Sequence, residues 1–281
     1  MSANPSVTGP GPGSLAILGG GNLGGALARG WARAGVLPAA TIRITRRDAA
    51  KLEPLAQEGF ATGTDNAAAV GAADAVILAV QPQQLPELAG QIRPALDPAR
   101  HRVISAVSGV TLTELAELLG RVPCVRAMPN TAVAIGESMT CLSAAPEHEA
   151  ALAEAGTLFS RVGRALVIAE ELMIPATALC ACGVAFFLRS VRAASQGGIE
   201  IGFHPEEALL LAAYTARGAA SLVLAEGTHP EAAIDQVTTP RGCTIAGLNE
   251  MEHRGFSSAF IKGILVSAKQ AGGLYGRPGD D

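Results

Sequence analysis

The sequence predicts an α/β domain built on a parallel sheet, followed by an all-α domain. In the first half of the chain, short continuous apolar runs alternate with helical segments, and a glycine-rich turn follows the first run. Beyond residue 171 no segment shows a convincing strand pattern. We therefore expect a flexible extension over residues 1–13, an α/β domain over 14–171 and a helical domain over 172–281.

The strands of the first domain are predicted from short runs of consecutive apolar residues. Such runs, separated by helical segments, are typical of parallel strands that are covered on both faces of the sheet. Helices are expected over residues 23–33 and 147–161. The expected strands span residues 15–18, 41–45, 73–80, 103–107, 122–127 and 165–168.

The helices of the second domain are predicted from their end signals. Pro205 and the two glutamates after it place a proline and acidic side chains in a first helical turn, which favours a helix start. Gly227 marks the end of that helix, near residue 225. Further helices are expected to begin at Pro230 and to span residues 244–253 and 257–270.

The composition is apolar and poor in charge. Hydrophobic residues make up 49% of the chain and charged residues 16%, and the formal net charge is -4. Disordered chains combine few apolar residues with much charge, and nucleic-acid-binding domains usually carry a basic excess, so both classes are excluded. The mean hydropathy of +0.31 leaves a membrane protein, or a soluble protein that hides apolar surface between subunits.

The uncharged run over residues 172–188 helps to choose between these two classes. Its 17 residues lie at the lower limit for a helix that spans a bilayer. Pro175, Thr177 and Gly183 weaken its apolar character. We therefore expect a helix that packs against other protein, with no membrane contact.

The cysteines and histidines show no disulfide or metal pattern. The five cysteines are odd in number and form no Cys-x-x-Cys pair, and the five histidines form no pair at helical spacing. The N-terminus lacks the basic start and the apolar core of a signal peptide. These features predict a cytoplasmic protein with reduced thiols and no metal site.

A glycine-rich turn between the first strand and the first helix predicts a dinucleotide site. The segment Gly19-Gly20-Gly21-Asn22-Leu23-Gly24 satisfies the pattern Gly-x-Gly-x-x-Gly. Gly19 permits the tight turn, Gly21 lets the backbone approach a pyrophosphate, and Gly24 permits close contact between helix and strand. The helix N-terminus that follows faces the phosphates. A flexible turn could carry the same glycines, but the position between a strand and a helix favours a Rossmann-type domain.

The end of the second strand indicates which dinucleotide binds. NAD sites usually place an acidic residue there for the ribose, whereas NADP sites place an arginine near the 2′-phosphate. The chain has Thr45-Arg46-Arg47 at this position, with Asp48 only beyond them. Paired arginines suit bidentate contacts to a phosphate, although a solvated basic turn would look the same. We expect NADPH, with NADH as the alternative.

Five motifs together identify a family. They are residues 19–24, 45–47, 78–82, 127–131 and 237–248. The most specific is the last, which reads V-T-T-P-R-G-C-T-I-A-G-L. It resembles the V-T-S-P-G-G-T-T-I-A-G-L of the pyrroline-5-carboxylate reductases, the last enzymes of proline biosynthesis. The resemblance covers nearly all of the chain after residue 14.

The resemblance implies an activity and an assembly. The activity is NADPH-dependent reduction of a cyclic imine, pyrroline-5-carboxylate, to L-proline. The assembly is a homodimer whose helical domains interlock, with dimers often joined into larger rings.

The turn before the helix at residue 244 is the expected substrate site. A turn that leads into a helix N-terminus supplies free N–H groups that suit a carboxylate. The resemblance places Thr244 where a threonine hydroxyl meets the imine nitrogen, and a plain helix cap is the alternative. It places Thr239 and Cys243 where the carboxylate is held, Cys243 through its backbone N–H. Gly242 belongs to the same turn, and we expect Arg241 to add a second carboxylate contact.

On the cofactor side, the resemblance assigns the end of the strand over residues 73–80. Ala79 and Val80 stand where the family's backbone meets the nicotinamide half. Asn66 falls where the family has an asparagine near the adenosine ribose, and a helix cap is the alternative for this residue. The remaining residues expected at the cofactor are Gln81, Pro82 and Asn130.

The chain departs from the family pattern at several positions. Gln81 replaces a lysine, and Ala132 replaces a proline. The segment C-A-C-G-V-A over residues 180–185 stands where the family often has S-G-S-G-P-A. Arg241 replaces a glycine, so an arginine must tolerate any positive φ that the turn requires.

These departures leave three alternatives to the leading function. One is a reductase of another cyclic imino acid, such as a six-membered ring. A second is a non-catalytic paralogue that senses the cofactor and acts through protein contacts. A third, a coenzyme-F420-linked NADP reductase, shares this kind of first domain but lacks the motif over residues 239–248.

Overall fold

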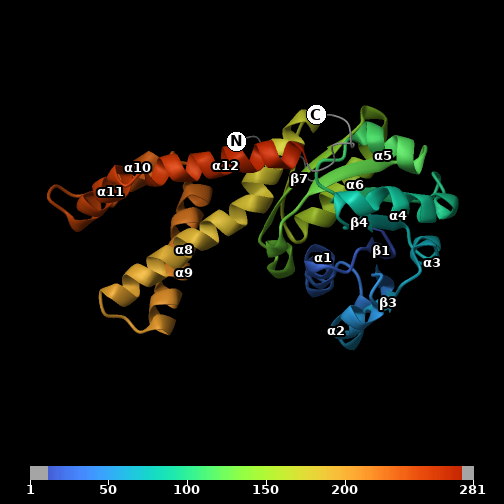
Figure 1. Cartoon of the computed structure of the whole chain (residues 1–281), viewed down its shortest axis with the longest axis horizontal. Coiled ribbons are helices and arrows are strands. Elements are labelled where there is room, and N and C mark those ends of the chain that lie inside the picture. The colour runs from blue at the N-terminus through green and yellow to red at the C-terminus, as the bar shows by residue number, and fades with distance from the viewer. Residues whose placement is uncertain (1–11, 274–281) are drawn as a thin grey trace. The chain divides into compact units, whose positions relative to one another are not determined.

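The computed structural model describes residues 12–273 (Figure 1). The chain divides into two compact units. One contains the chain up to Ala181 and the segment from Ala268 onward, and the other is Cys182–Ser267. Of the expected extension over residues 1–13, all but the last two residues lie outside the described part of the chain. The domain boundary between residues 171 and 172 stays a prediction.

The first unit is built on an eight-stranded sheet in the order β3-β2-β1-β4-β5-β6-β7-β8. All neighbouring strands are parallel except β6 and β7, which pair antiparallel through Met128 and Cys141. The predicted parallel sheet is therefore confirmed, with one antiparallel strand pair, β6 and β7, that was not predicted. The strands are β1 (Leu15–Leu18), β2 (Ile42–Thr45), β3 (Ala61–Gly63), β4 (Ala75–Leu78), β5 (Arg102–Ser105), β6 (Cys124–Met128), β7 (Ser138–Ala144) and β8 (Gly163–Val167).

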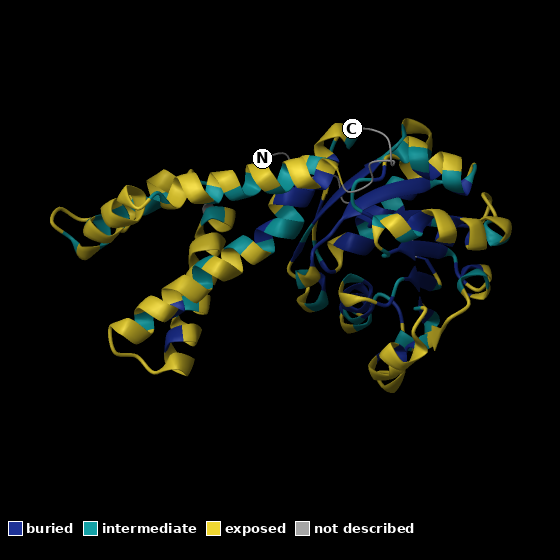
Figure 2. Cartoon of the chain, in the orientation of Figure 1, coloured by how far each residue is buried: buried dark blue, intermediate teal, exposed yellow. Residues whose placement is uncertain are grey.

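Helices cover both faces of this sheet. Successive residues of a strand point to opposite faces, so Leu15 and Ile17 of β1 pack in one buried cluster and Ala16 and Leu18 in another. The strands β1, β4 and β6 are accordingly buried along their whole length, whereas the edge strands β3 and β8 are largely exposed (Figure 2). The helices of this unit are α1 (Asn22–Arg33), α2 (Glu53–Gln57), α3 (Asn66–Gly71), α4 (Leu85–Ile92), α5 (Leu112–Leu119), α6 (Glu149–Ser160) and α7 (Met173–Ala176).

Trp31, the single tryptophan of the sequence, anchors α1 to α6. Its side chain is completely buried, and its ring meets that of Phe159 edge-on with 5.5 Å between the ring centres. The indole N–H donates a hydrogen bond of 3.1 Å to the carbonyl of Leu158. A buried indole needs such a partner, so this contact fixes the face of α1 that packs on the sheet.

The second unit is entirely helical, as the sequence predicts. Pro205 begins α9, and Gly227 ends it with a φ of 62°, which confirms both predicted helix signals. Gly198 lets α8 approach α9 closely, because a Cβ atom there would lie 3.0 Å from Cβ of Ala208. The helices are α8 (Gly183–Glu200), α9 (Pro205–Glu226), α10 (Pro230–Gln236), α11 (Cys243–His253) and α12 (Phe256–Gly272), the last of which continues into the first unit.

The run over residues 172–188 does not form one regular helix. After α7, residues Thr177–Cys182 form a π-helix, η8, and α8 begins only at Gly183. A π-helix bonds each N–H to the carbonyl five residues back and occurs frequently at functional sites. The expected helix over this run is therefore present but contains a π-helical segment, and its packing against other protein stays a prediction.

The second unit leaves many large apolar side chains exposed (Figure 2). Leu224 of α9, for instance, is 84% exposed and Phe187 of α8 is 61% exposed. Two helical stretches, Glu170–Glu200 and Pro205–Ala225, are long and apolar enough to cross a membrane by length and composition alone, which is a weak indication. Apolar surface of this extent usually marks an interaction site.

Candidate functional site

A cleft of about 410 Å³ opens at the carboxyl ends of β1, β2 and β4. β1 lies between β2 and β4, so the chain crosses the sheet in opposite directions on either side of this strand. Ligands of open α/β sheets bind at such a switch point. The cleft is lined by Gly19, Gly20, Gly21, Thr45, Arg46, Arg47, Asp48, Lys51, Asn66, Ala79, Val80, Gln81, Gln84, Glu87, Leu88 and Gln91.

The glycine-rich turn forms one wall of the cleft, and each motif glycine has its own geometric reason. Gly19 has a φ of +119°, and a Cβ atom there would collide with the carbonyl of Ala79. A Cβ atom on Gly24 would collide with the carbonyl of Gly19. Gly21 has no atom within 4 Å of its Cβ position, so its backbone borders open space. This turn leaves room for a ligand that lies against bare backbone.

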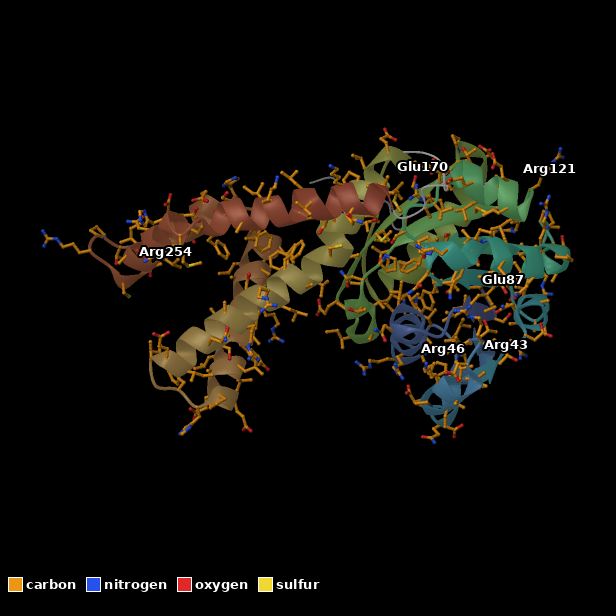
Figure 3. The ribbon with its side chains drawn as sticks, viewed as in Figure 1. Arg43, Arg46, Glu87, Arg121, Glu170 and Arg254 are labelled. Carbon is orange, nitrogen blue, oxygen red and sulfur yellow. The ribbon has the colours of Figure 1, made fainter. Side chains whose placement is uncertain are left out.

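The cleft also holds a group of charges at the end of β2. Arg46 donates a hydrogen bond of 3.0 Å from Nη1 to the carbonyl of Gly20 and so fixes the glycine-rich turn (Figure 3). Nζ of Lys51 lies 3.2 Å from Oδ2 of Asp48, and this pairing lowers the pKa of the Asp48 carboxyl. With Arg47 and Glu87, the lining carries three cations and two anions, a net charge of +1.

A chain of polar side chains crosses the floor of the cleft. The Thr45 hydroxyl donates to Oδ1 of Asn66 at 2.6 Å, and Nδ2 of Asn66 donates to Oε1 of Gln91 at 2.7 Å. Gln91 in turn donates to Glu87 at 3.4 Å. The N-cap of α3 is Asp65, which accepts from the N–H of Ala68 at 2.9 Å. The helix-cap interpretation of Asn66 is therefore wrong.

These features fit a dinucleotide. At two of the glycines, Gly19 and Gly24, the turn has no room for a side chain. The N-cap of α1 is Gly21, which has no side chain, so the first N–H groups of α1 have no side-chain cap. Such groups suit a pyrophosphate. The arginines and Lys51 supply positive charge for a further phosphate, as an NADP site requires.

The second predicted site lies in the Cys182–Ser267 unit. Thr239 to Gly242 form a tight turn in which the N–H of Gly242 donates to the carbonyl of Thr239 at 2.9 Å. Arg241 has a φ of 62°, the one positive φ of a non-glycine residue among residues 12–273. Pro240 before a residue with positive φ is the arrangement of a type II turn, which favours glycine at this position. The chain thus keeps a glycine-like turn although it carries arginine.

The turn leads directly into α11, whose N-cap is Gly242 and has no side-chain cap. No acidic residue lies in the first turn of this helix. Thr244 is the second residue of α11 and is half-buried, so it is not the helix cap and that alternative is wrong. The first N–H groups of α11 are available for an anion, with the Thr244 hydroxyl close to them in the chain.

Asn130 lies away from the cleft lining. It is the N-cap of the short helical turn Thr131–Ile135, and its Oδ1 accepts from the N–H of Ala132 at 3.0 Å. Its Nδ2 donates to the carbonyl of Cys180 at 3.1 Å, which ties the end of β6 to η8. Both ends of the Asn130 amide are thus engaged within the first unit.

Two family models match the chain. One, described as pyrroline-5-carboxylate reductase dimerisation, matches residues 170–274. The other, described as NADP oxidoreductase coenzyme F420-dependent, matches residues 14–109. The first match contains the turn and α11, whereas the second covers β1 to β5 and the helices between them.

Curated relatives extend these matches over more than nine tenths of the chain. Pyrroline-5-carboxylate reductase 1 of Dictyostelium discoideum is 47% identical over 274 residues, which cover 93% of this chain and 50% of the relative. Pyrroline-5-carboxylate reductase 2 of the same organism is 44% identical over 275 residues, which cover 92% of each chain. The chain belongs to the pyrroline-5-carboxylate reductase family.

Solved structures of this family share the fold. A pyrroline-5-carboxylate reductase of Coxiella burnetii has a TM-score of 0.80 at 26% identity and covers 94% of this chain and 99% of its own. The NADP-bound pyrroline carboxylate reductase of Plasmodium falciparum has a TM-score of 0.82 at 20% identity, with 94% and 98% covered. The α/β domain and the helical dimerisation domain that follows are therefore those of pyrroline-5-carboxylate reductases.

Several residues expected at the cofactor of a pyrroline-5-carboxylate reductase meet in the cleft and others do not. Asn22, Leu23 and Gly24 belong to the first turn of α1, and Pro82 begins the turn that precedes α4. Gln81 lines the cleft, and its backbone N–H donates to Oε1 of Gln84 at 3.4 Å. The expected residues that line the cleft are Gly19, Gly21, Thr45, Arg46, Arg47, Asn66, Ala79, Val80 and Gln81.

One face of α4, with Gln84 just before it, and two residues after β2, Asp48 and Lys51, line the cleft without having been predicted as cofactor residues. Gln84, Glu87, Leu88 and Gln91 all line the cleft, and their spacing of three, four and seven residues places them on one helical face. That spacing, just after a strand assigned to the cofactor, was a usable signal. Nothing in the sequence around Lys51 predicts that it lines the cleft, because no helix is predicted that would place it on one face with Arg46. No group of three or more metal-binding side chains occurs within residues 12–273.

Proposed function

We propose that this protein reduces 1-pyrroline-5-carboxylate to L-proline with NADPH. The observation that carries the proposal is the turn from Thr239 to Gly242, which keeps a strained geometry and leads into an uncapped helix N-terminus. Strained backbone persists where the site needs it. The 44% identity to a reductase of this name, over 92% of both chains, supports the same substrate.

In the proposed reaction NADPH supplies the hydride that the imine carbon accepts. The N–H groups at the start of α11 hold the substrate carboxylate, with Thr239 and the backbone N–H of Cys243 as the main contacts. The substrate is reduced as its protonated iminium form, so hydride transfer gives the ring amine without a further proton. The Thr244 hydroxyl donates a hydrogen bond to the lone pair that forms on the ring nitrogen as the carbon is reduced. The protein thus contributes orientation and electrostatic fit, and the residues named here need not change their ionisation.

NADPH is the proposed cofactor because of the cationic group after β2. Asp48 is paired with Lys51, so the acidic residue that would favour the NAD ribose is already engaged. Arg47 is exposed at the cleft and carries a guanidinium that suits a phosphate. NADH remains a weaker alternative cofactor.

We further propose a cytoplasmic homodimer formed through the helical domain, assembled into a larger ring of dimers. The match of residues 170–274 to a dimerisation family supports this interface, and the exposed apolar side chains of α8 and α9 supply its surface. A partner subunit, and not a lipid bilayer, is therefore the proposed neighbour of these helices. Light scattering at micromolar concentration should give a mass of at least two chains, and a monomer would contradict this proposal.

A second candidate function is reduction of a different cyclic imino acid, such as a six-membered ring. Two observations favour it, the arginine with positive φ in the turn and the π-helix at residues 177–182, where the sequence departs from the family. Both features lie in stretches that the resemblance assigns to the substrate.

A panel of cyclic imines, each tested with NADPH and with NADH, distinguishes these functions. We expect the highest kcat/KM for the five-membered ring with NADPH. Thr244→Ala should lower kcat/KM by about 10- to 100-fold, the loss of one hydrogen bond to a developing charge. Cys243→Ala is the control and should retain activity, because only its backbone is proposed to act. Cofactor binding without turnover of any imine would instead support a cofactor-sensing paralogue.

A further inference from the structure

Two thiols that the proposed reaction does not use face each other in the first unit. Cys141 lies in β7 and Cys180 in η8, and their Sγ atoms are 3.9 Å apart although 39 residues separate them in sequence. Both belong to the same compact unit. The five cysteines are all free thiols in this structure.

The surroundings hold these thiols in contact. Cys141 is 4% exposed and packs in a small apolar cluster with Met128, Met173 and Ala176, which Cys180 borders. The backbone of Cys180 is fixed through its carbonyl, which accepts the hydrogen bond from Asn130. The contact between the two thiols is therefore maintained by the packing around Cys141 and by the hydrogen bond to the Cys180 backbone.

The two thiols differ in chemistry. Either thiol can donate in the hydrogen bond between them, and when the S–H of the buried Cys141 donates, it stabilises the Cys180 thiolate and lowers the pKa of Cys180 to about 7. The same hydrogen bond, together with burial, raises the pKa of the Cys141 thiol. Cys180 is also the more exposed of the two. A partly exposed thiolate next to a second thiol is the arrangement of cysteines that oxidise reversibly.

We propose that Cys141 and Cys180 form a reversible disulfide when the protein meets hydrogen peroxide. The Cys180 thiolate attacks one peroxide oxygen, an S–O bond forms, the O–O bond breaks, and hydroxide leaves. The sulfur of Cys141 then attacks the Cys180 sulfenic acid, an S–S bond forms, and the S–O bond breaks. The hydroxyl departs as water with the Cys141 proton. The hydroxide released first takes up the proton that Cys180 gave to solvent on ionising, so two thiols are oxidised and hydrogen peroxide is reduced to two waters.

The geometry limits the change that this step requires. The sulfur atoms must approach from 3.9 Å to about 2.05 Å, the length of a disulfide. Because β7 lies inside the sheet, η8 is the element that would shift. A small-molecule dithiol reverses the step by exchange, with the thiolate of the dithiol attacking one sulfur of the disulfide.

The test treats the reduced, full-length protein with hydrogen peroxide, blocks remaining thiols with N-ethylmaleimide and digests it with trypsin. Cleavage at arginine yields one peptide over residues 127–161, whose single cysteine is Cys141, and another over 165–189, which holds Cys180 and Cys182. We expect titratable thiols to fall from five per chain to three, and fragmentation to link Cys141 to Cys180. Dithiothreitol should restore all five.

Matched variants assign the linkage. Cys182→Ser should keep the cross-linked peptide, whereas Cys180→Ser and Cys141→Ala should lose it. Alkylation of Cys180 by iodoacetamide should be half-maximal near pH 7 in the parent protein and should shift to higher pH in Cys141→Ala, which lacks the donor. If Cys141→Ala does not fold, the peptide map of the parent protein decides. Five remaining thiols, sulfinic acid on Cys180 without a link, or a link through Cys182 would each overturn the proposal.

Discussion

The hydroxyl of Thr45 donates a hydrogen bond of 2.6 Å to the side chain of Asn66 and thereby joins the end of β2 to the start of α3. Thr45 is 3% exposed, so its hydroxyl has little access to water. The second end of the Asn66 amide holds Gln91. Asn66 therefore links β2, α3 and α4 at the cleft.

Asn66→Ala should weaken NADPH binding. The substitution leaves the buried hydroxyl of Thr45 without its partner, at a cost of about 1–3 kcal/mol, and it also removes the donor to the exposed Gln91. We expect KM for NADPH to rise about tenfold with a smaller change in kcat. Asp65→Ala is the control, since it removes the α3 cap and lowers stability by about 1 kcal/mol without touching the cleft. An equal effect of both variants on KM would assign Asn66 to stability alone.

Two glycines of the motif should separate stability from cofactor binding. Gly24→Ala forces a Cβ atom against the carbonyl of Gly19 and should cost about 2 kcal/mol or more in the free energy of unfolding. Gly21→Ala meets no atom within 4 Å and has an ordinary extended backbone, so its melting temperature should stay unchanged. It should nevertheless weaken NADPH binding, because the methyl group occupies the space next to the turn. Thermal melts and fluorescence titration with NADPH measure the two effects, and tight NADPH binding by Gly21→Ala would contradict this assignment.

The two arginines after β2 should differ in their effect on cofactor choice. Arg47→Ala should weaken NADPH binding by about 10- to 100-fold, the value of a charge-assisted contact, and leave NADH binding unchanged. Arg46→Ala should weaken both cofactors, because Arg46 also holds the carbonyl of Gly20. Arg43→Ala is the matched control, since this exposed arginine of β2 does not line the cleft. Equal losses for NADPH and NADH in Arg47→Ala would remove its role in selectivity.

Arg241 offers a test that separates strain from charge. Arg241→Gly relieves a positive φ that costs an L-residue about 1–2 kcal/mol, although the added freedom of the unfolded chain returns part of that gain. We expect a net stabilisation of up to about 1 kcal/mol by thermal or urea unfolding. Arg241→Ala should retain the strain. Both variants should raise KM for the imino acid if the guanidinium holds the carboxylate, and an unchanged KM in both would exclude that contact.

The sequence predicted the parts of the fold that local patterns specify. The strand–glycine–helix unit at Gly19 and the helix signals at Pro205 and Gly227 are where local chemistry predicted them. β7 was missed because its sequence, S-M-T-C-L-S-A, mixes polar and apolar residues, and its reversed direction depends on pairing with β6. The π-helix was missed because its geometry depends on contacts such as that between Asn130 and Cys180.

The cleft was predicted in part for the same reason. Thr45, Arg46 and Ala79 follow strands directly, so their position at a carboxyl edge could be inferred from sequence. Gln91 reaches the cleft only because α4 packs beside α3, and Lys51 only because the chain bends back after β2. The helical spacing of Gln84, Glu87, Leu88 and Gln91 was a local signal for this face of α4, whereas the sequence around Lys51 carries no such signal.

Trp31 also provides an intrinsic fluorescence probe of unfolding. It is the single tryptophan and lies wholly inside the sheet-containing unit, so its emission should follow the unfolding of that unit. Helical content measured by circular dichroism follows both units. Coincident transitions in the two signals would mean that the chain unfolds in one cooperative transition. Separate transitions would mean that the helical unit unfolds independently of the sheet-containing unit.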